Sequence, residues 1–161
     1  RVMDFINLDS IPSGTQIHVA IMTHGGYNQE DSVLINKGSI DRGLFLATIY
    51  HTEKDEDKNI IRDEIIRCKP DKTVTKGIKY GNYDKLNNNG FMEKDSLVEN
   101  RDVIISKVVP IKENRNDPTK LIKYEDQSKT HRTNEECYVD RNYTNRNGDG
   151  YDFAKVKIRT T

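Results

Sequence analysis

Hydrophobic residues in the first third of the chain form short runs on either side of a polar, glycine-containing stretch. Residues 15–22 end in the apolar run Val19-Ala20-Ile21-Met22, and this pattern predicts a buried strand. Residues 44–50 place alternate apolar side chains on opposite faces and predict a second strand. Between them, the apolar residues after Asp31-Ser32 predict a short helix. This helix would begin at an Asp-Ser N-cap and end at Lys37-Gly38.

The rest of the chain alternates short β-branched runs with turn signals. Strands are predicted over 103–105 and 108–109, and a pair of strands over 137–140 and 151–159 that is joined by a turn-rich connection. The Asn87-Asn88-Asn89-Gly90 sequence predicts a tight turn. Together these patterns predict a mainly β fold with short helices.

Two charged stretches interrupt this β pattern. Residues 53–58 mix acidic and basic side chains, and residues 111–134 are polar and charge-rich. Because mixed charge runs are usually solvated, the first predicts an exposed loop or helix start and the second a long loop.

The composition limits the class of protein. Of 161 residues, 34% are hydrophobic and 32% charged, so we expect either part of a larger assembly or long solvated loops. The formal net charge is zero, and any nucleic-acid binding must therefore come from local patches. Cys68 and Cys137 lie far apart with no ligand-spaced partners, which argues against a disulfide framework or a zinc site and suggests a reducing compartment. No apolar run approaches the length of a membrane-spanning helix.

The adjacent carboxylates of Glu30 and Asp31 are the main candidates for chemistry. They follow Gly25-Gly26, a pair that permits a left-handed turn. Mg²⁺ is often held by only one or two carboxylates together with substrate phosphates, so the pair suffices as part of a magnesium site. Residue types alone favour the simpler interpretation, in which Asp31 caps a helix and Glu30 is solvated.

The sequence around this pair resembles a known family. Gly26-Tyr27-Asn28-Gln29-Glu30-Asp31-Ser32-Val33, followed by Ser39-Ile40-Asp41-Arg42-Gly43-Leu44-Phe45, is similar to the second-largest, beta-type subunit of multisubunit DNA-directed RNA polymerases, in its polymerase II and giant-virus forms. Tyr80-Gly81-Asn82-Tyr83-Asp84-Lys85-Leu86 resembles the family's Gly-Thr-Tyr-Asp-Lys-Leu stretch. Residues 102–107 and 156–161 follow in the expected order, so the resemblance covers essentially the whole chain.

The resemblance implies a domain arrangement. Residues 1–46 and 154–161 would belong to the hybrid-binding region, which includes a double-psi β-barrel. Residues 47–153 would form an inserted β-rich wall, called the flap in bacteria, at the upstream end of the RNA–DNA hybrid. The chain is expected to be an internal fragment of the subunit.

The resemblance also implies an activity, which is template-dependent RNA synthesis from nucleoside triphosphates by a two-metal nucleotidyl transfer. The largest subunit would hold the first Mg²⁺. A second, substrate-borne Mg²⁺ would be shared between the largest subunit and Asp31, with Glu30 acting nearby. The fragment alone is expected to be inactive.

The partners implied are the largest subunit and other polymerase subunits, the DNA template, the RNA–DNA hybrid and the nucleoside triphosphate, without a membrane. Among local basic residues, Arg42, Lys76 and Lys79 are candidates for contact with the nucleic-acid backbone. The location would be the nucleus for a polymerase II, or the cytoplasmic virus factory or virion for a viral enzyme.

Two other classes of function stay open from the sequence. One is a non-catalytic β-rich interaction module in which Glu30-Asp31 is only a helix cap. The other is an independent Mg²⁺-dependent phosphohydrolase, which needs further carboxylates or histidines at defined positions, and none stands out.

Overall fold

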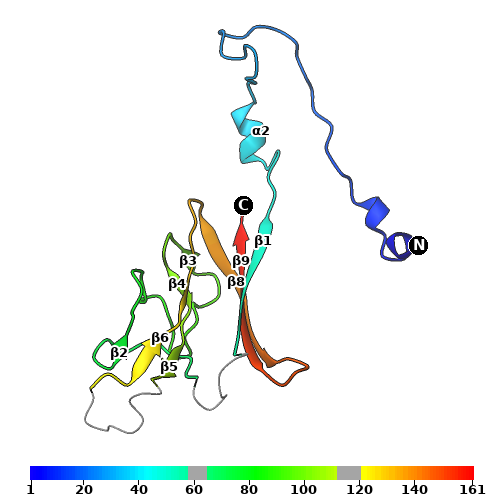
Figure 1. The fold of residues 1–161 in the computed structure, drawn as a ribbon. Coiled ribbons are helices and arrows are strands. Elements are labelled where there is room, and N and C mark those ends of the chain that lie inside the picture. The colour runs from blue at the N-terminus through cyan, green and yellow to red at the C-terminus, as the bar shows by residue number, and fades with distance from the viewer. Residues whose placement is uncertain (58–64, 112–120) are drawn as a thin grey trace. The chain divides into compact units, whose positions relative to one another are not determined.

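The structure, a computed structural model, describes residues 1–57, 65–111 and 121–161 (Figure 1). The chain divides into two compact units, Arg1–Phe45 and Leu46–Thr161. Helices of the described residues are short and lie in the first unit, while the strands lie in the second. The predicted mainly β fold with short helices is therefore confirmed. No helix in the described part of the chain is long and apolar enough to cross a membrane.

The first unit contains α1 (Val2–Phe5), the 3₁₀ helix η1 (Leu8–Ser10) and α2 (Lys37–Asp41). The buried strand predicted over 15–22 is wrong, because these residues form no strand and Val19 and Ile21 are 74% and 100% exposed. The apolar pattern suits a strand, but a strand forms only when a neighbouring strand pairs with its backbone.

The helix predicted to begin at Asp31-Ser32 is also wrong. Residues 32–36 are not helical, and the helix α2 begins where the predicted one was to end. Asn36 is the N-cap, and its Oδ1 accepts a hydrogen bond from the Ser39 N–H at 3.0 Å. Asn caps a helix as well as Asp or Ser does, and the β-branched side chains of Val33 and Ile35 disfavour helix before it.

The second unit is organised by a four-stranded antiparallel sheet in the order β1-β9-β8-β3. Its strands are β1 (Ile49–Glu56), β3 (Leu97–Val98), β8 (Cys137–Arg146) and β9 (Asp152–Thr160). The predicted pairing of the last two strands is confirmed, but β8 continues to Arg146, beyond its predicted end at residue 140, and a turn at 147–150 joins the two strands.

Strand β1 corrects two predictions. It begins at Ile49 rather than at residue 44, and it continues through Glu53–Glu56, which the charge pattern assigned to a solvated loop. Each charged residue has a partner on β9, for example Asp55 opposite Ala154. Since β1 lies at the edge of the sheet, charged side chains are common there. Residues 58–64 lie outside the described residues.

Smaller sheets complete the second unit. One has the order β2-β6-β5, formed by β2 (Thr75–Lys76), β5 (Val108–Pro110) and β6 (Tyr124–Asp126). The other pairs β4 (Val103–Ile105) with β7 (Lys129–Thr130). The strands predicted at 103–105 and 108–109 are confirmed. The long loop predicted over 111–134 is corrected by β6 and β7, and its residues 112–120 are outside the described part.

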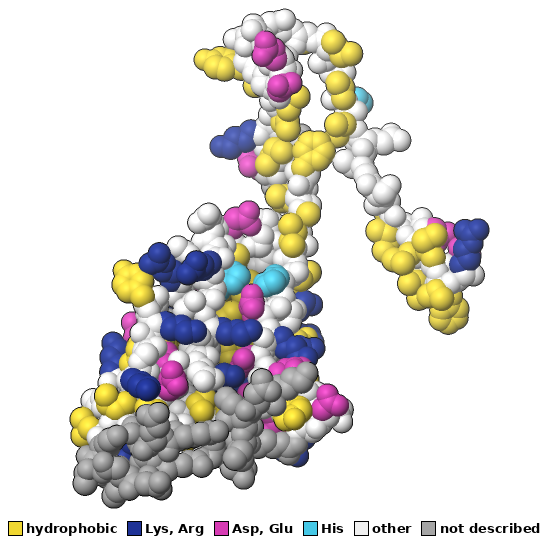
Figure 2. Space-filling view, in the orientation of Figure 1, with side chains coloured by type: hydrophobic (Ala, Val, Ile, Leu, Met, Phe, Trp, Pro, Cys, Tyr) yellow, Lys and Arg dark blue, Asp and Glu magenta, His cyan; other side chains and the backbone are white. Residues whose placement is uncertain are grey.

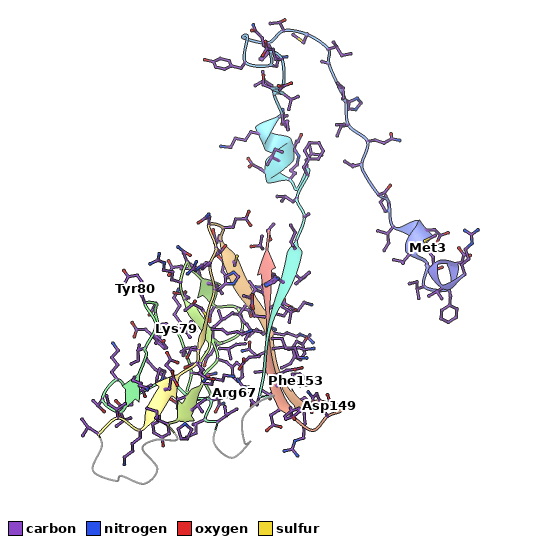
Figure 3. All side chains as sticks on the ribbon, in the orientation of Figure 1. Met3, Arg67, Lys79, Tyr80, Asp149 and Phe153 are labelled. Atoms are coloured by element: carbon purple, nitrogen blue, oxygen red, sulfur yellow. The ribbon has the colours of Figure 1, made fainter. Side chains whose placement is uncertain are left out.

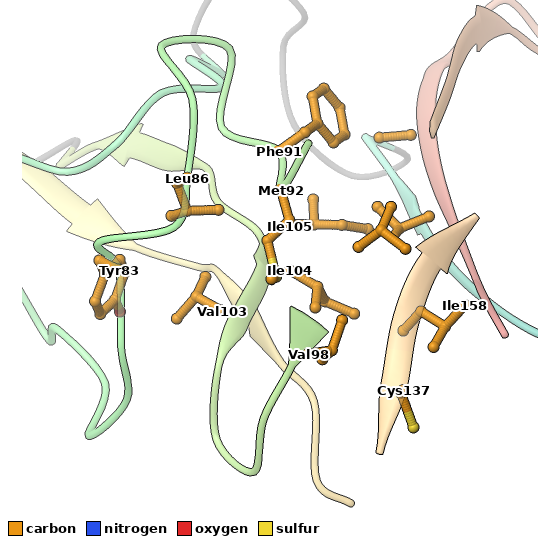
Figure 4. Close-up of a cluster of buried hydrophobic side chains, with 13 residues drawn as sticks. Tyr83, Leu86, Phe91, Met92, Val98, Val103, Ile104, Ile105, Cys137 and Ile158 are labelled. Atoms are coloured by element: carbon orange, nitrogen blue, oxygen red, sulfur yellow. The ribbon is translucent and has the colours of Figure 1, made fainter. Parts of the chain in front are cut away.

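The hydrophobic core lies between the four-stranded sheet and the segment from Tyr83 to Ile105 (Figure 4). On β9 the side chains of Ala154, Val156 and Ile158 are buried, whereas the alternate residues Lys155 and Lys157 are not. This period of two is the expected pattern for a sheet with one buried face.

The predicted turn at Asn87–Gly90 is confirmed by a hydrogen bond from the Gly90 N–H to the Asn87 carbonyl, 3.1 Å long. Gly90 has a φ of +80°, and a Cβ at this position would lie 2.5 Å from the Ser106 carbonyl oxygen. Only glycine fits both the backbone conformation and this close approach.

Residues 154–160 belong to β9 and pair with β1 and β8 within the second unit. Residues 47–153 and 154–161 are therefore in one compact unit. The assignment of these ranges to a wall and a hybrid-binding region stays a prediction.

Candidate active-site loop

The acidic pair lies at the tip of a four-residue turn, Gln29–Ser32. The Ser32 N–H and the Ser32 hydroxyl both donate hydrogen bonds to the Gln29 carbonyl, at 3.2 and 2.6 Å. Glu30 and Asp31 occupy the two central positions. The predicted helix cap at Asp31 is thus replaced by a turn, and no helix dipole acts on this carboxylate.

Glu30 has a φ of +53°, which is uncommon for a residue other than glycine. This left-handed conformation costs free energy that the surrounding hydrogen bonds must offset. With this conformation at Glu30, the chain turns between Gln29 and Ser32, and the two carboxylates lie on adjacent residues of that turn.

The side chain of Asn28 ties this segment together. Its Nδ2 donates to the Met22 carbonyl at 2.6 Å, and its Oδ1 accepts from the His24 N–H at 3.1 Å. Gly25 and Gly26 have φ values of +62° and +75°, so the left-handed turn expected of this pair is confirmed. Asn28 therefore closes the loop that leads into the acidic turn.

Both carboxylates are exposed. Within the described residues, no hydrogen bond or ion pair engages the side chain of Glu30 or of Asp31. Their oxygens are thus available to a cation. No cluster of three or more His, Cys, Asp or Glu that could hold a metal is found among the described residues. The pair therefore fits a Mg²⁺ ion that receives most of its ligands from substrate phosphates, water or a partner chain.

The predicted basic contacts fall in both units. Arg42 is exposed and follows α2 as its C-cap residue. Lys76 is exposed on β2, and Lys79 is exposed on the loop that follows. The Lys79 Nζ donates a hydrogen bond to the Ser128 carbonyl, and the Lys79 N–H donates to the Tyr83 hydroxyl at 3.0 Å. Lys79 is thus partly a structural residue.

A largely buried ion cluster was missed by sequence reasoning. The Arg67 guanidinium lies 3.1 Å from the Asp55 carboxylate and 2.6 Å from that of Asp57, and the Lys107 ammonium lies 2.8 Å from Asp55. Burial raises the pKa of Asp57, and the two cations oppose that shift. A charged strand gives no hydrophobic signal, and the residues are far apart in sequence, so the pattern offered no indication of the cluster.

The Tyr83-Asp84-Lys85-Leu86 motif has structural roles in the second unit. Tyr83 and Leu86 belong to the core, and the Tyr83 hydroxyl donates to the Asp126 carboxylate. The Lys85 ammonium lies 2.7 Å from the Asp102 carboxylate. Three of the four side chains therefore hold the loop in place.

A pocket of about 490 Å³ lies beside the end of the β8–β9 hairpin. Its charged residues pair with one another, Arg67 with Asp57 and Arg146 with Asp152 at 3.0 Å. Figure 3 labels Arg67 and Phe153, which both line it. None of the residues predicted for chemistry or for nucleic-acid contact lines this pocket.

Comparison with known proteins identifies the family of the chain. The family RNA polymerase Rpb2, domain 6, matches residues 1–161. The chain belongs to this family. It is 36% identical over 167 residues to the DNA-directed RNA polymerase II subunit RPB2 of Schizosaccharomyces pombe, covering 100% of this chain and 14% of the relative. It is 35% identical to the DNA-directed RNA polymerase II subunit 2 of Arabidopsis thaliana, covering 99% and 14%.

The matched relatives include a further RPB2 from Encephalitozoon cuniculi, 36% identical over 169 residues. The chain therefore corresponds to a segment of the second-largest polymerase subunit that spans about 14% of the length of these relatives. The resemblance to that subunit is confirmed.

Proposed function

We propose that the chain is a segment of the catalytic core of a DNA-directed RNA polymerase, a nucleotidyltransferase that makes RNA from nucleoside triphosphates on a DNA template. The observation that carries the proposal is the family match over all 161 residues. Its partners are then the largest subunit and the other polymerase subunits, and its location is the nucleus. The segment alone is expected to be inactive, because the remaining catalytic groups lie on the largest subunit and in other parts of the second-largest subunit.

In this role Asp31 is a ligand of the second, substrate-borne Mg²⁺. Mg²⁺ supplies charge stabilisation to the attacking and leaving oxygens of the transfer. Asp31 contributes an exposed, unpaired carboxylate at the tip of a short turn. Glu30 stands next to it and adds negative charge or holds a water molecule of the ion. Two observations support these roles. Both residues lie in the family motif, and within the described residues neither carboxylate forms a hydrogen bond or an ion pair.

Residues 47–153 act as the wall behind the RNA–DNA hybrid. Residues 1–46 and 154–161 belong to the hybrid-binding region. Arg42, Lys76 and Lys79 are proposed to contact nucleic-acid phosphates. All three are exposed, and a phosphate contact needs only an accessible cation within reach of the backbone.

The test of the metal role is cleavage of the protein backbone by Fe²⁺ in place of Mg²⁺ in the assembled polymerase. Fe²⁺ generates hydroxyl radicals that cut the chain close to the ion. We expect cleavage at the Gln29–Ser32 turn only when nucleoside triphosphate is present, and loss of that cleavage in Asp31→Asn. Asp41→Asn, which alters an exposed carboxylate of α2, is the matched control. Cleavage of the largest subunit without cleavage at this turn contradicts the role of Asp31.

A further inference from the structure

A cluster of cations lies around one tyrosine on the second unit, three of them exposed and one, Lys129, half-buried. Figure 3 labels Lys79 and Tyr80 there, and in the same orientation Figure 2 shows Lys and Arg side chains gathered over this face. The cluster, called the Tyr80 patch below, consists of Lys79, Tyr80, Arg101, Lys129 and Arg132.

Backbone contacts bring the three segments of the patch together. The Arg101 N–H donates to the His131 carbonyl at 2.8 Å, and the Arg101 carbonyl accepts from the Asn82 N–H at 3.2 Å. A Cβ on Gly81 would lie 2.5 Å from the Arg101 carbonyl oxygen, so the segments approach as closely as glycine allows. The patch is therefore a fixed part of the fold.

The positive charge of the patch is not neutralised within the described residues. Other cations of the second unit form ion pairs there, for example Lys85 with Asp102 and Arg159 with Asp95. No ion pair joins any of the four patch cations to a carboxylate of the described chain. Lys79 and Lys129 donate instead to the neutral carbonyls of Ser128 and Lys54. Although the net charge of the chain is zero, these four cations lie together without an ion-pair partner among the described residues.

Within the described residues, neither burial nor a hydrogen bond explains why position 80 is a tyrosine. Its side chain is 85% exposed, and no hydrogen bond of its hydroxyl occurs within the described part of the chain. Tyr83, three residues later, is buried and bonded to Asp126. The Arg101 guanidinium lies 5.2 Å from the Tyr80 ring centroid and so holds the ring among the cations.

We propose that the Tyr80 patch binds an unpaired stretch of nucleic acid, with one base stacked on Tyr80 and phosphates on the surrounding cations. The proposal rests on the proposed function. It adds that the bound nucleic acid is unpaired and that Tyr80 contacts one of its bases. Cationic side chains around an exposed aromatic ring are the usual means of binding single strands. A duplex offers no open base face to the ring, and an acidic peptide uses the cations but not the aromatic surface.

The first test replaces Tyr80 in the full-length subunit by a photoreactive phenylalanine analogue. The assembled polymerase is then irradiated on a scaffold with labelled RNA and DNA strands that carry unpaired extensions. We expect a nuclease-sensitive cross-link to an unpaired strand, and none from the same analogue at Lys94, an exposed lysine outside the patch. Cross-links to polypeptide alone indicate an acidic protein partner, and they overturn the proposal, as does an absence of cross-links.

The second test measures affinity for scaffolds with and without the unpaired extension. Tyr80→Ala is expected to weaken binding of the extended scaffold about 10-fold through loss of one stacked base, while Tyr80→Phe retains it. Arg101→Gln combined with Arg132→Gln is expected to reduce the slope of log affinity against log salt by roughly two, one for each lost cation. Lys94→Gln should change neither quantity.

Equal loss of affinity for both scaffolds, or equal loss in Tyr80→Phe and Tyr80→Ala, overturns the stacking role. Single-nucleotide addition is measured on the same preparations. If it is normal while the patch variants bind like the parent, only the patch is contradicted. An assembled polymerase that contains the parent chain and adds no nucleotides contradicts the proposed function instead.

Discussion

At the scale of single residues, the acidic loop is shaped by side chains that bond to the backbone rather than by a helix. The sequence indicated the left-handed Gly25-Gly26 pair correctly. The N-cap was misplaced because Asn36 and Asp31-Ser32 both satisfy the capping rules, and only the backbone decides between them. The role of Asn28 was not predictable, since it depends on contacts with residues four and six positions earlier.

Loss of the Asn28 side chain should disturb the acidic turn without removing a carboxylate. In Asn28→Ala the Met22 carbonyl and the His24 N–H lose their partner, so Asp31 is held less firmly. We expect single-nucleotide addition by the assembled polymerase to slow by about 10-fold, since small displacements of reacting groups are costly. Asn36→Ala, which removes the cap of α2, is the control and should slow the reaction less. Equal rates for Asn28→Ala and the parent would show that the loop holds its shape unaided.

The ion cluster around Asp55 and Asp57 gives a prediction about stability. The Lys107 side chain is 7% exposed, and Lys107→Met leaves buried carboxylates with one cation instead of two. Breaking a buried pair in this way costs about 3–5 kcal/mol. The exposed pair between Arg146 and Asp152 serves as comparison, and Arg146→Gln should cost about 0–1 kcal/mol. Urea unfolding of the chain measures both, and similar costs would mean that the cluster is solvated.

At the scale of elements, the strands with apolar, β-branched patterns were predicted and the charged strand was not. Residues 103–105 and 151–159 bury alternate or successive side chains, and this periodicity is visible in the sequence. Strand β1 carries Glu53, Lys54, Asp55 and Glu56, and its pairing with β9 comes from backbone hydrogen bonds that leave no mark on hydropathy. The strand predicted over 15–22 failed for the converse reason, since the pattern was present without a pairing strand.

The turn at Asn87–Gly90 offers a test of how tightly the loop packs on β4 and the residues after it. Gly90→Ala places a Cβ against the Ser106 carbonyl in a left-handed conformation, and we expect a loss of about 1–3 kcal/mol in the free energy of unfolding. Gly148→Ala is the matched control, because nothing lies within 4 Å of its Cβ position. The control should change stability by less than about 0.5 kcal/mol. Equal effects in thermal unfolding would contradict the close approach at Gly90.

At the scale of the whole molecule, the low hydrophobic content agrees with the burial of apolar side chains in the two units. The second unit has a core that includes Met92, Ile104 and Val156, while apolar side chains of the first unit, such as Phe5 and Ile21, are exposed. Composition alone predicted either part of a larger assembly or long solvated loops, and the chain spans about 14% of the length of the polymerase subunits that it matches. The chemical role depended on the resemblance, because two adjacent carboxylates specify no reaction by themselves.

Global stability should depend on pH through His131. Burial lowers the pKa of His131, the nearby Glu53 carboxylate opposes this, and His51 lowers it further. The unfolded chain therefore binds the proton more readily than the folded chain. The stability that the neutral His131 contributes is fully present above pH about 6.5 and is lost as the pH falls below that value. His131→Gln should flatten this decline just below pH 6.5 in urea unfolding of the chain. An unchanged pH profile would mean that His131 titrates like a free histidine.

The role proposed for Asp31 is to serve the second Mg²⁺ of nucleotide addition. The most direct measurement is single-nucleotide addition by the assembled polymerase carrying Asp31→Asn, titrated with Mg²⁺, beside Asp41→Asn. We expect a slower reaction with a raised Mg²⁺ requirement for Asp31→Asn, while binding of the RNA–DNA hybrid is intact. A normal rate at the parent's Mg²⁺ concentration would contradict it and leave the Gln29–Ser32 turn as scaffold for catalytic groups on other chains.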